Sequence, residues 1–173
     1  MNIVLMGYMG SGKSLIGSNL SKKMKMDYLD LDDYIENQEK KSIAKIFEDH
    51  GEIYFRKKES FYLNEVLNTY NDTIISLGGG TPCFAGNIEM IINKDHVKSI
   101  YLQTSLDELT NRLFAERSKR PLIAHLESLE DLKDFIRKHV FERSFYYNQA
   151  DYKITTDQKQ VDQITEEITS LLF

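Results

Sequence analysis

The chain has 173 residues, of which 22 are basic and 27 acidic, so its formal net charge is −5. This length predicts a single domain over residues 1–173, and the acidic balance argues against a nucleic-acid partner. No apolar run approaches the ~20 residues of a membrane span, Met1–Met6 lacks a basic leader, and the lone Cys83 cannot form a disulfide within the chain. We therefore expect a cytoplasmic protein without a signal peptide or a membrane partner.

Hydrophobic patterning predicts strands and helices in alternation. Strands are expected at residues 2–6, 27–29, 73–77, 97–102 and 152–155, and helices at 13–24, 88–93, 106–114, 129–147 and 161–172, with a broken helical region over 33–70. Ser105 and Glu108 predict a capping box at the start of helix 106–114. The alternation is typical of an α/β fold with a mostly parallel sheet and helices on both faces, in which ligands bind at the carboxyl ends of the strands.

The first expected strand leads directly into the glycine-rich segment Gly7–Ser14, with the sequence GYMGSGKS, and this segment opens the first helix. Glycines let successive backbone N–H groups surround phosphate oxygens, and the N-terminus of the helix directs partial positive charge at the same anion. Lys13 can then reach the β- and γ-phosphates, and the Ser14 hydroxyl can bind Mg²⁺. A chance match is the alternative, but the strand–loop–helix context argues against it, so we predict a nucleoside triphosphate site.

Acidic side chains follow the second expected strand. Asp30 and Asp32 are two residues apart, so in an extended segment they share a face. At a triphosphate site, carboxylates either hold Mg²⁺ or orient and deprotonate an acceptor hydroxyl. Alternatively, Asp32 or Asp33 caps the next helix; for Asp33 we favour the cap, whereas we assign Asp30 and Asp32 to function.

Three consecutive glycines, Gly78, Gly79 and Gly80, follow the third expected strand. A turn rarely requires all three, because each costs backbone entropy on folding. They allow a ligand to lie against bare backbone, although a flexible turn is the alternative.

Two arginines interrupt apolar helical stripes. Arg56 falls in the stripe Ile53, Arg56, Ser60, Leu63, Leu67, and Arg143 in the stripe Leu129, Leu132, Ile136, Val140, Arg143, Tyr147. An inward guanidinium requires an anion, and periodicity does not decide between an internal carboxylate and a ligand. The basic segment 115–123, which includes Arg120, is expected to close over the triphosphate; an exposed loop is the alternative, which the phosphate loop argues against.

Together these motifs resemble those of the shikimate kinases. The phosphate loop, Asp30-x-Asp32, Phe55-Arg56, the triple glycine, Lys119–Leu122 and Arg143-x-x-Tyr146 occur in that family's order and at similar spacing along nearly the whole chain. The resemblance implies a P-loop kinase fold, similar to nucleoside monophosphate kinases, with a five-stranded parallel sheet of order 2-3-1-4-5. It also implies a substrate-binding region at about 31–62 and a lid at about 113–126.

The activity implied by the resemblance is Mg²⁺-dependent transfer of a phosphoryl group from ATP to the 3-hydroxyl of shikimate, for aromatic amino acid biosynthesis, by a monomer. Asp32, Lys13 and Arg120 would be catalytic, with Asp32 accepting the substrate hydroxyl and drawing off its proton. Ser14 would bind Mg²⁺ and Asp30 would support the ion through water. The remaining implied roles are ATP binding by Gly10, Ser11, Gly12, Lys13, Ser14, Leu15, Arg112 and Arg120, substrate binding by Asp32, Arg56, Gly78, Gly79, Gly80 and Arg143, and bracing of the pocket by Phe47, Phe55 and Glu59.

The chain departs from the family pattern at three places. Ser144 stands where many members have proline. The loop 156–160, which the resemblance places beside the adenine, lacks the proline and arginine of some members, and the stretch Arg112–Arg120 is slightly longer. These departures weaken the adenine and lid assignments.

Two other functions are open. One is a related small kinase acting on gluconate or a nucleoside monophosphate. The other is a nucleotide-gated switch, for which Asn93-Lys94-Asp95-His96 is the closest approach to a guanine-reading element, with histidine where the second acid should be.

Overall fold

One parallel sheet forms the centre of the computed structural model, which describes residues 1–173. The strands lie in the order β2-β3-β1-β4-β5, and each neighbouring pair is parallel. Their bounds are β1 (Asn2–Met6), β2 (Asp27–Asp30), β3 (Thr73–Ser76), β4 (Val97–Gln103) and β5 (Tyr152–Thr155). The predicted strands and their order are confirmed, and the predicted boundaries differ by no more than one residue.

Helices fill the intervals between the strands. They are α1 (Lys13–Met24), α2 (Leu31–Glu39), α3 (Ile43–Thr69), α4 (Asn87–Ile92), α5 (Leu106–Glu116), α6 (Leu129–Tyr147) and α7 (Val161–Leu172). Short 3₁₀ turns lie at Thr81–Cys83 and Arg117–Lys119. The expected broken helical region is α2 followed by α3, which itself bends at Gly51, where φ is 81° and ψ is 177°.

Helices cover both faces of the sheet, and β1 shows why. All five of its side chains are buried, as expected for a central parallel strand, and the four apolar ones alternate between two clusters. Ile3 and Leu5 belong to the cluster that includes residues of α1 and α7, whereas Val4 and Met6 belong to the larger cluster formed with α2 to α6. Apolar side chains therefore pack on both faces of β1, which leaves polar chemistry to the ends of the strands.

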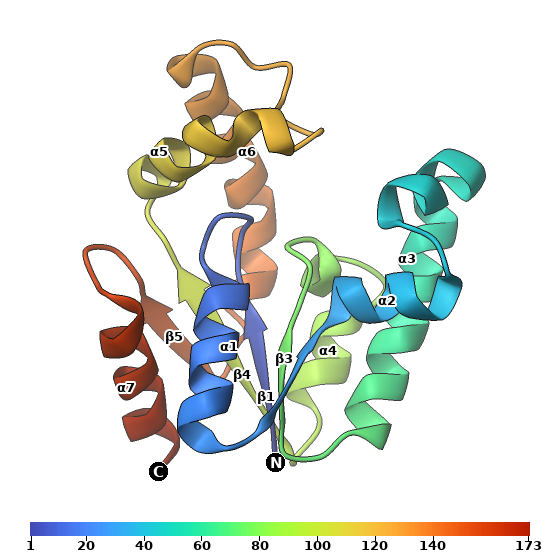
Figure 1. Ribbon diagram of the computed structural model, residues 1–173, viewed down its shortest axis with the longest axis vertical. Helices are drawn as coiled ribbons and strands as arrows, with labels where there is room; N and C mark the ends of the chain where they lie inside the picture. Colours follow the sequence, from blue (N-terminus) through green and yellow to red (C-terminus); the bar gives the residue numbers. More distant parts are fainter.

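The carboxyl ends of the strands lie between two groups of helices (Figure 1). Figure 1 shows α5 and the adjoining part of α6 on one side of these ends, α2 and the start of α3 on the other, and the loop after β1 between them. These segments include the ones for which we predict lid and substrate-binding roles. No helix in the structure is both long enough and apolar enough to cross a bilayer.

Two local expectations are wrong. The stripes include Ile53, which is 77% exposed just after the bend at Gly51, and Leu129, which is 45% exposed as the first residue of α6. The capping box at Ser105 is only half formed. Its hydroxyl accepts from the backbone N–H of Glu108 at 3.3 Å, but its own N–H donates to Asp157 at 2.9 Å because the Glu108 carboxylate pairs with Arg112.

Candidate active site

The phosphate loop connects β1 to α1. Gly10 and Gly12 have φ values of 82° and 90°, which side-chain-bearing residues rarely adopt, and Gly12 is the N-cap residue of α1. The hydroxyl of Ser11 is buried without a hydrogen-bond partner, so the loop holds at least one polar group that a ligand can satisfy. This geometry matches the anion cradle that the sequence predicts.

A cavity of about 740 Å³ opens over this loop. Its lining includes most of the predicted site residues, namely Gly10, Ser11, Gly12, Lys13, Ser14, Leu15, Asp30, Asp32, Gly78, Gly79, Arg112 and Arg120. Residues to which we gave no individual role also line it: Met9, Ile16, Leu77, Ala115, Glu116, Thr156, Lys159, Val161 and Ile164. Ala115 and Glu116 lie in the segment expected to close over the triphosphate, and Thr156 and Lys159 lie in the loop 156–160 expected beside the adenine. Val161 and Ile164 also follow β5, and the rule that ligands bind at the carboxyl ends of the strands could have found them.

Lys13 lies folded back on its own loop. Its ammonium donates to the carbonyl oxygens of Gly7 at 2.7 Å and Tyr8 at 3.0 Å. Burial lowers the pKa of Lys13 to about 8, although the carboxylates of Asp32 and Asp30 oppose the shift. Both acceptors are backbone carbonyls of the phosphate loop, so a triphosphate bound there would compete with them for the ammonium.

Asp30 is the N-cap residue of α2, so the assignment of the cap to Asp33 is wrong. Its Oδ1 accepts from the backbone N–H groups of Asp32 at 3.0 Å and Asp33 at 3.5 Å, because Asp30 is the last residue with extended backbone. Its Oδ2 accepts from the Ser14 hydroxyl at 3.2 Å. A carboxylate and a hydroxyl thus meet beside the phosphate loop, and such oxygen donors are the ligands that Mg²⁺ prefers.

Asp32, in the first turn of α2, lies against the glycine loop. A Cβ atom added to Gly78 would be 3.0 Å from Asp32 Oδ1, so a side chain at this position would displace the carboxylate. Burial, together with the charges of Asp30 and Glu59, raises the pKa of Asp32 to about 6, although Lys13 opposes the shift. A carboxylate with this pKa is a suitable general base near neutral pH.

Arg56 and Arg143, which come from α3 and α6, meet at the same glycine loop. A Cβ atom on Gly80 would be 2.8 Å from Arg56 Nη2 and 3.3 Å from Arg143 Nη2, and one on Gly79 would be 3.2 Å from Arg143 Nη1. None of the three glycines has a positive φ. Their common feature is therefore the missing side chain, which leaves space for two guanidinium groups.

The two arginines differ in their protein partners. Arg56 Nη1 donates to Glu59 at 2.8 Å; Glu59 is 1% exposed and also accepts from the Thr81 hydroxyl at 2.7 Å. Arg143 has no carboxylate partner; its neighbours are the glycine loop, the Tyr8 ring and the Tyr147 hydroxyl. Periodicity did not decide whether an internal carboxylate or a ligand binds these arginines. In the structure an internal carboxylate binds Arg56, whereas the guanidinium of Arg143 is available to a ligand.

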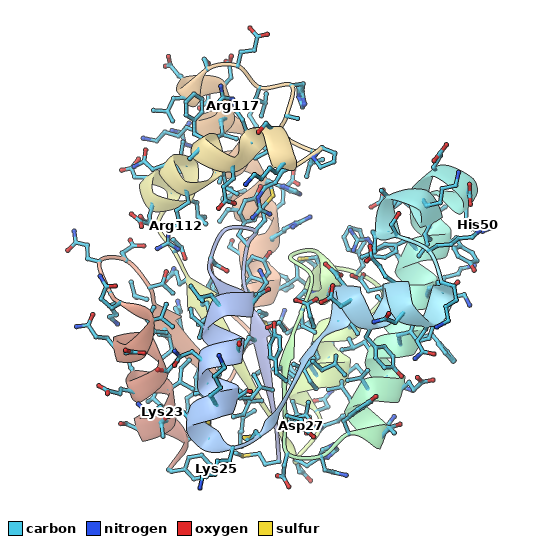
Figure 2. All side chains as sticks on the ribbon, viewed as in Figure 1. Lys23, Lys25, Asp27, His50, Arg112 and Arg117 are labelled. Atoms are coloured by element: carbon cyan, nitrogen blue, oxygen red, sulfur yellow. The ribbon has the colours of Figure 1, made fainter.

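Arg112 and Arg120 approach the cavity from α5 and the segment after it. Arg112 Nη1 donates to the Gly10 carbonyl at 3.1 Å, and Figure 2 shows this side chain on the side of α5 nearest the phosphate loop. Arg120 pairs with Glu116 at 3.0 Å, but its Nε is buried without a partner. Both guanidinium groups add positive charge around the cavity, and an anion could satisfy Arg120 Nε.

Comparison with known proteins identifies the family. A family profile described as shikimate kinase matches residues 9–173. The chain belongs to the shikimate kinase family. The family resemblance that the motifs predict is confirmed.

Two curated members of the shikimate kinase family illustrate the similarity. The shikimate kinase of Flavobacterium johnsoniae is 49% identical over 170 residues, covering 98% of each chain. That of Flavobacterium psychrophilum is 46% identical over 171 residues, covering 99% of this chain and 98% of the relative.

Solved structures of shikimate kinases share the fold. The one from Bacteroides thetaiotaomicron has a TM-score of 0.90 at 32% identity and covers 99% of this chain and 98% of its own. The one from Acinetobacter baumannii, in complex with shikimate, has a TM-score of 0.84 at 31% identity and covers 99% of this chain and 92% of its own.

Proposed function

We propose that this chain phosphorylates the 3-hydroxyl of shikimate with ATP, giving shikimate 3-phosphate and ADP in aromatic amino acid biosynthesis. Membership of the shikimate kinase family supports this activity. The observation that carries the proposal is the meeting of a phosphate loop, a buried carboxylate with a raised pKa, and two arginines around one glycine loop.

ATP binds with its phosphates in the loop Gly7–Ser14. Backbone N–H groups and the N-terminus of α1 hold the anion, and Lys13 exchanges two carbonyl acceptors for phosphate oxygens. Arg120 adds charge from the lid segment, where its unpartnered Nε supports contact with an anion. Because phosphoryl transfer has a loose transition state, positioning and charge stabilisation supply most of the catalysis.

Asp32 orients the acceptor hydroxyl and takes its proton. Its raised pKa supports this role, because a base that is only just ionised at neutral pH accepts a proton readily. The carboxylate lies beside Gly78 in the lining of the cavity that also contains Lys13, so the acceptor oxygen can face the transferred phosphorus.

Arg56 and Arg143 bind the carboxylate of shikimate. A planar guanidinium forms two parallel hydrogen bonds to a carboxylate, which gives orientation as well as affinity. Glu59 holds Arg56 in place, and the bare backbone of Gly78–Gly80 lets the sugar-like ring approach closely. A neutral acceptor would leave Arg143 without a partner, which argues for an acidic substrate.

Mg²⁺ is the cofactor that fits this site. Ser14 and Asp30 would hold it, directly and through water, because their hydroxyl and carboxylate already lie together beside the phosphate loop. When bound, the ion neutralises charge on the β- and γ-phosphates.

A single assay tests the proposed function. ADP release is measured with ATP and Mg²⁺ in the presence of shikimate, gluconate or a nucleoside monophosphate, with ATP alone as the blank. We expect turnover with shikimate only. Turnover confined to gluconate or to a nucleotide acceptor would replace the proposed function with that of a related small kinase, and no turnover with any acceptor would point to a nucleotide switch.

A further inference from the structure

Helix α6 contacts the phosphate loop and the glycine loop through residues spaced four apart. His139 Nδ1 shares a hydrogen bond of 2.9 Å with the hydroxyl of Tyr8 in the phosphate loop. One turn later, Arg143 lies beside Gly79 and Gly80. After another turn, the Tyr147 hydroxyl donates to the carbonyl of Gly79 at 2.5 Å. One rigid face of the helix therefore connects the nucleotide loop to the arginine of the acceptor site.

Tyr8 contacts the nucleotide side through its backbone and α6 through its side chain. Its carbonyl accepts from Lys13 at 3.0 Å and from the Ser11 N–H at 3.2 Å. Its side chain is 2% exposed and meets the ring of His139 edge to face, with centroids 5.4 Å apart. The guanidinium of Arg143 is 5.8 Å from the centroid of the Tyr8 ring.

His139 has one polar side-chain contact in the structure, which is Tyr8. The rest of its ring packs on Phe135, one turn earlier, with centroids 5.4 Å apart. A half-buried imidazole contributes little apolar area, and a leucine would fill the same space with fewer polar requirements. A role beyond packing therefore has to come from the hydrogen bond.

Building on the proposed function, we infer that His139 is a positioning residue that couples the two substrate sites. Through Tyr8, it makes the affinity of the Arg56–Arg143 site for an acceptor carboxylate depend on occupation of the phosphate loop. When a triphosphate draws Lys13 away from the carbonyls of Gly7 and Tyr8, the backbone of Tyr8 loses a partner and shifts. The hydrogen bond transmits this shift to α6 one turn before Arg143, because a packed core moves as a unit.

Thermodynamic linkage makes the coupling measurable. If nucleotide raises the affinity for the acceptor, the acceptor raises the affinity for nucleotide by the same factor. Shikimate is titrated calorimetrically with and without a non-hydrolysable ATP analogue and Mg²⁺. The ratio of interest is the dissociation constant of shikimate without nucleotide divided by that with nucleotide. We expect a ratio above one for the wild type, and a ratio about 2- to 10-fold smaller for Tyr8→Phe and for His139→Leu, as expected for loss of one neutral hydrogen bond.

The double variant Tyr8→Phe/His139→Leu should show no further loss, because both changes remove the same contact. His139→Asn, whose amide keeps a polar atom near the position of Nδ1, should retain more of the ratio than His139→Leu. The matched control is His96→Asn, which should leave the ratio unchanged, because the His96 side chain bonds only to the Leu67 carbonyl and lies near the amino end of β4. Thermal unfolding of each variant reports the purely structural cost.

The outcomes separate this inference from the proposed function. A wild-type ratio of one, or an unchanged ratio in Tyr8→Phe with shikimate binding intact, overturns the coupling and leaves the proposed function standing. Additive losses in the double variant also overturn it. A wild type that binds no shikimate in either condition overturns the proposed function and the coupling with it.

Discussion

At the scale of single residues, folding disfavours the ionised form of the Asp32 carboxyl group. Its pKa is raised from 3.8 to about 6, chiefly by burial, so between these values the native state binds more protons than the unfolded state. The free energy of unfolding therefore falls as the pH rises from about 4 to about 6. Ionised Asp32 then costs up to about 3 kcal/mol at neutral pH, at 1.36 kcal/mol per pKa unit. Such a cost is expected at a site kept for chemistry rather than for stability.

Asp32→Asn should consequently be more stable and nearly inactive. We expect turnover to fall by about 10²- to 10⁴-fold because the base is lost, while affinity for nucleotide stays nearly intact. The free energy of unfolding at pH 8 should rise by about 1–3 kcal/mol, and this gain should disappear by pH 4. Steady-state kinetics and urea denaturation measure the two effects, with the exposed Asp95→Asn as the control. Turnover near that of the wild type would exclude Asp32 as the base.

Arg56 supports a second prediction, based on the geometry of its guanidinium. Arg56→Lys keeps the positive charge beside buried Glu59 but loses the planar fork that suits a carboxylate. We expect KM for shikimate to rise about 10- to 100-fold, the range for charge-assisted hydrogen bonds, with a smaller change in KM for ATP. The control is Arg137→Lys on α6, where the arginine is exposed and pairs with Asp134. If KM for shikimate is unchanged in Arg56→Lys, this arginine does not bind the substrate carboxylate.

At the scale of elements, the bend in α3 depends on one residue. Gly51 has φ of 81° and ψ of 177°, a conformation that only glycine adopts readily, and a Cβ atom there would meet nothing within 4 Å. Gly51→Ala should therefore cost about 1–3 kcal/mol through backbone strain alone. Urea denaturation measures this cost, and Lys57→Ala, at an exposed site on the same helix, should change it by less than about 0.5 kcal/mol. An unchanged unfolding free energy for Gly51→Ala would show that the bend relaxes without strain.

Elements also show what the sequence could and could not predict. Buried strands such as Ile3–Met6 are predictable because continuous apolar runs bounded by glycine have few alternatives. The bend at Gly51 leaves Ile53 outside the core. Helical periodicity assumes a continuous helix, so it does not predict this change of direction. The cap at Asp30 was missed because three nearby aspartates are chemically equivalent until the end of β2 is known to within one residue.

Some features of the site could be predicted from local motifs, whereas others depend on tertiary contacts. Lys13 and Ser14 follow from a contiguous motif, and the family resemblance supplied the positions of Asp32, Arg56 and Arg143. The partner of Arg56 and the lack of one for Arg143 depend on how α3 and α6 approach the glycine loop, which is a tertiary property. Hydrophobic patterning does not single out cavity residues such as Val161 and Ile164. An apolar side chain that lines a ligand site gives the same pattern as one that packs against another helix.

At the scale of the whole molecule, the cavity lining has more cations than carboxylates although the chain has a negative net charge. The chain has a formal net charge of −5, yet Lys13, Arg112, Arg120 and Lys159 all line one cavity. Asp30, Asp32 and Glu116 also line this cavity, so its four cations exceed its carboxylates by one. Positive charge concentrated in a recess attracts an anionic nucleotide despite the negative net charge of the chain. Part of this positive charge lies at the end of α5 and in the segment after it, which has few contacts with the sheet.

The segment 113–126 is therefore where we expect the largest response to ligands. Leu113 and Ile123 are fully buried in the larger apolar cluster, whereas Pro121, Leu122 and Ala124 are exposed, so the segment is anchored at its start and at Ile123 and is exposed around Ile123. Contact between Arg120 and the phosphates would order it. Amide hydrogen exchange should slow by roughly tenfold across 113–126 when a non-hydrolysable ATP analogue and Mg²⁺ are bound, equivalent to ~1.4 kcal/mol of local stabilisation. Arg120→Ala should abolish most of this protection, and α4, which lies outside the cavity, should exchange at the same rate throughout. Protection that is equal in Arg120→Ala and in the wild type would show that this arginine does not close the lid.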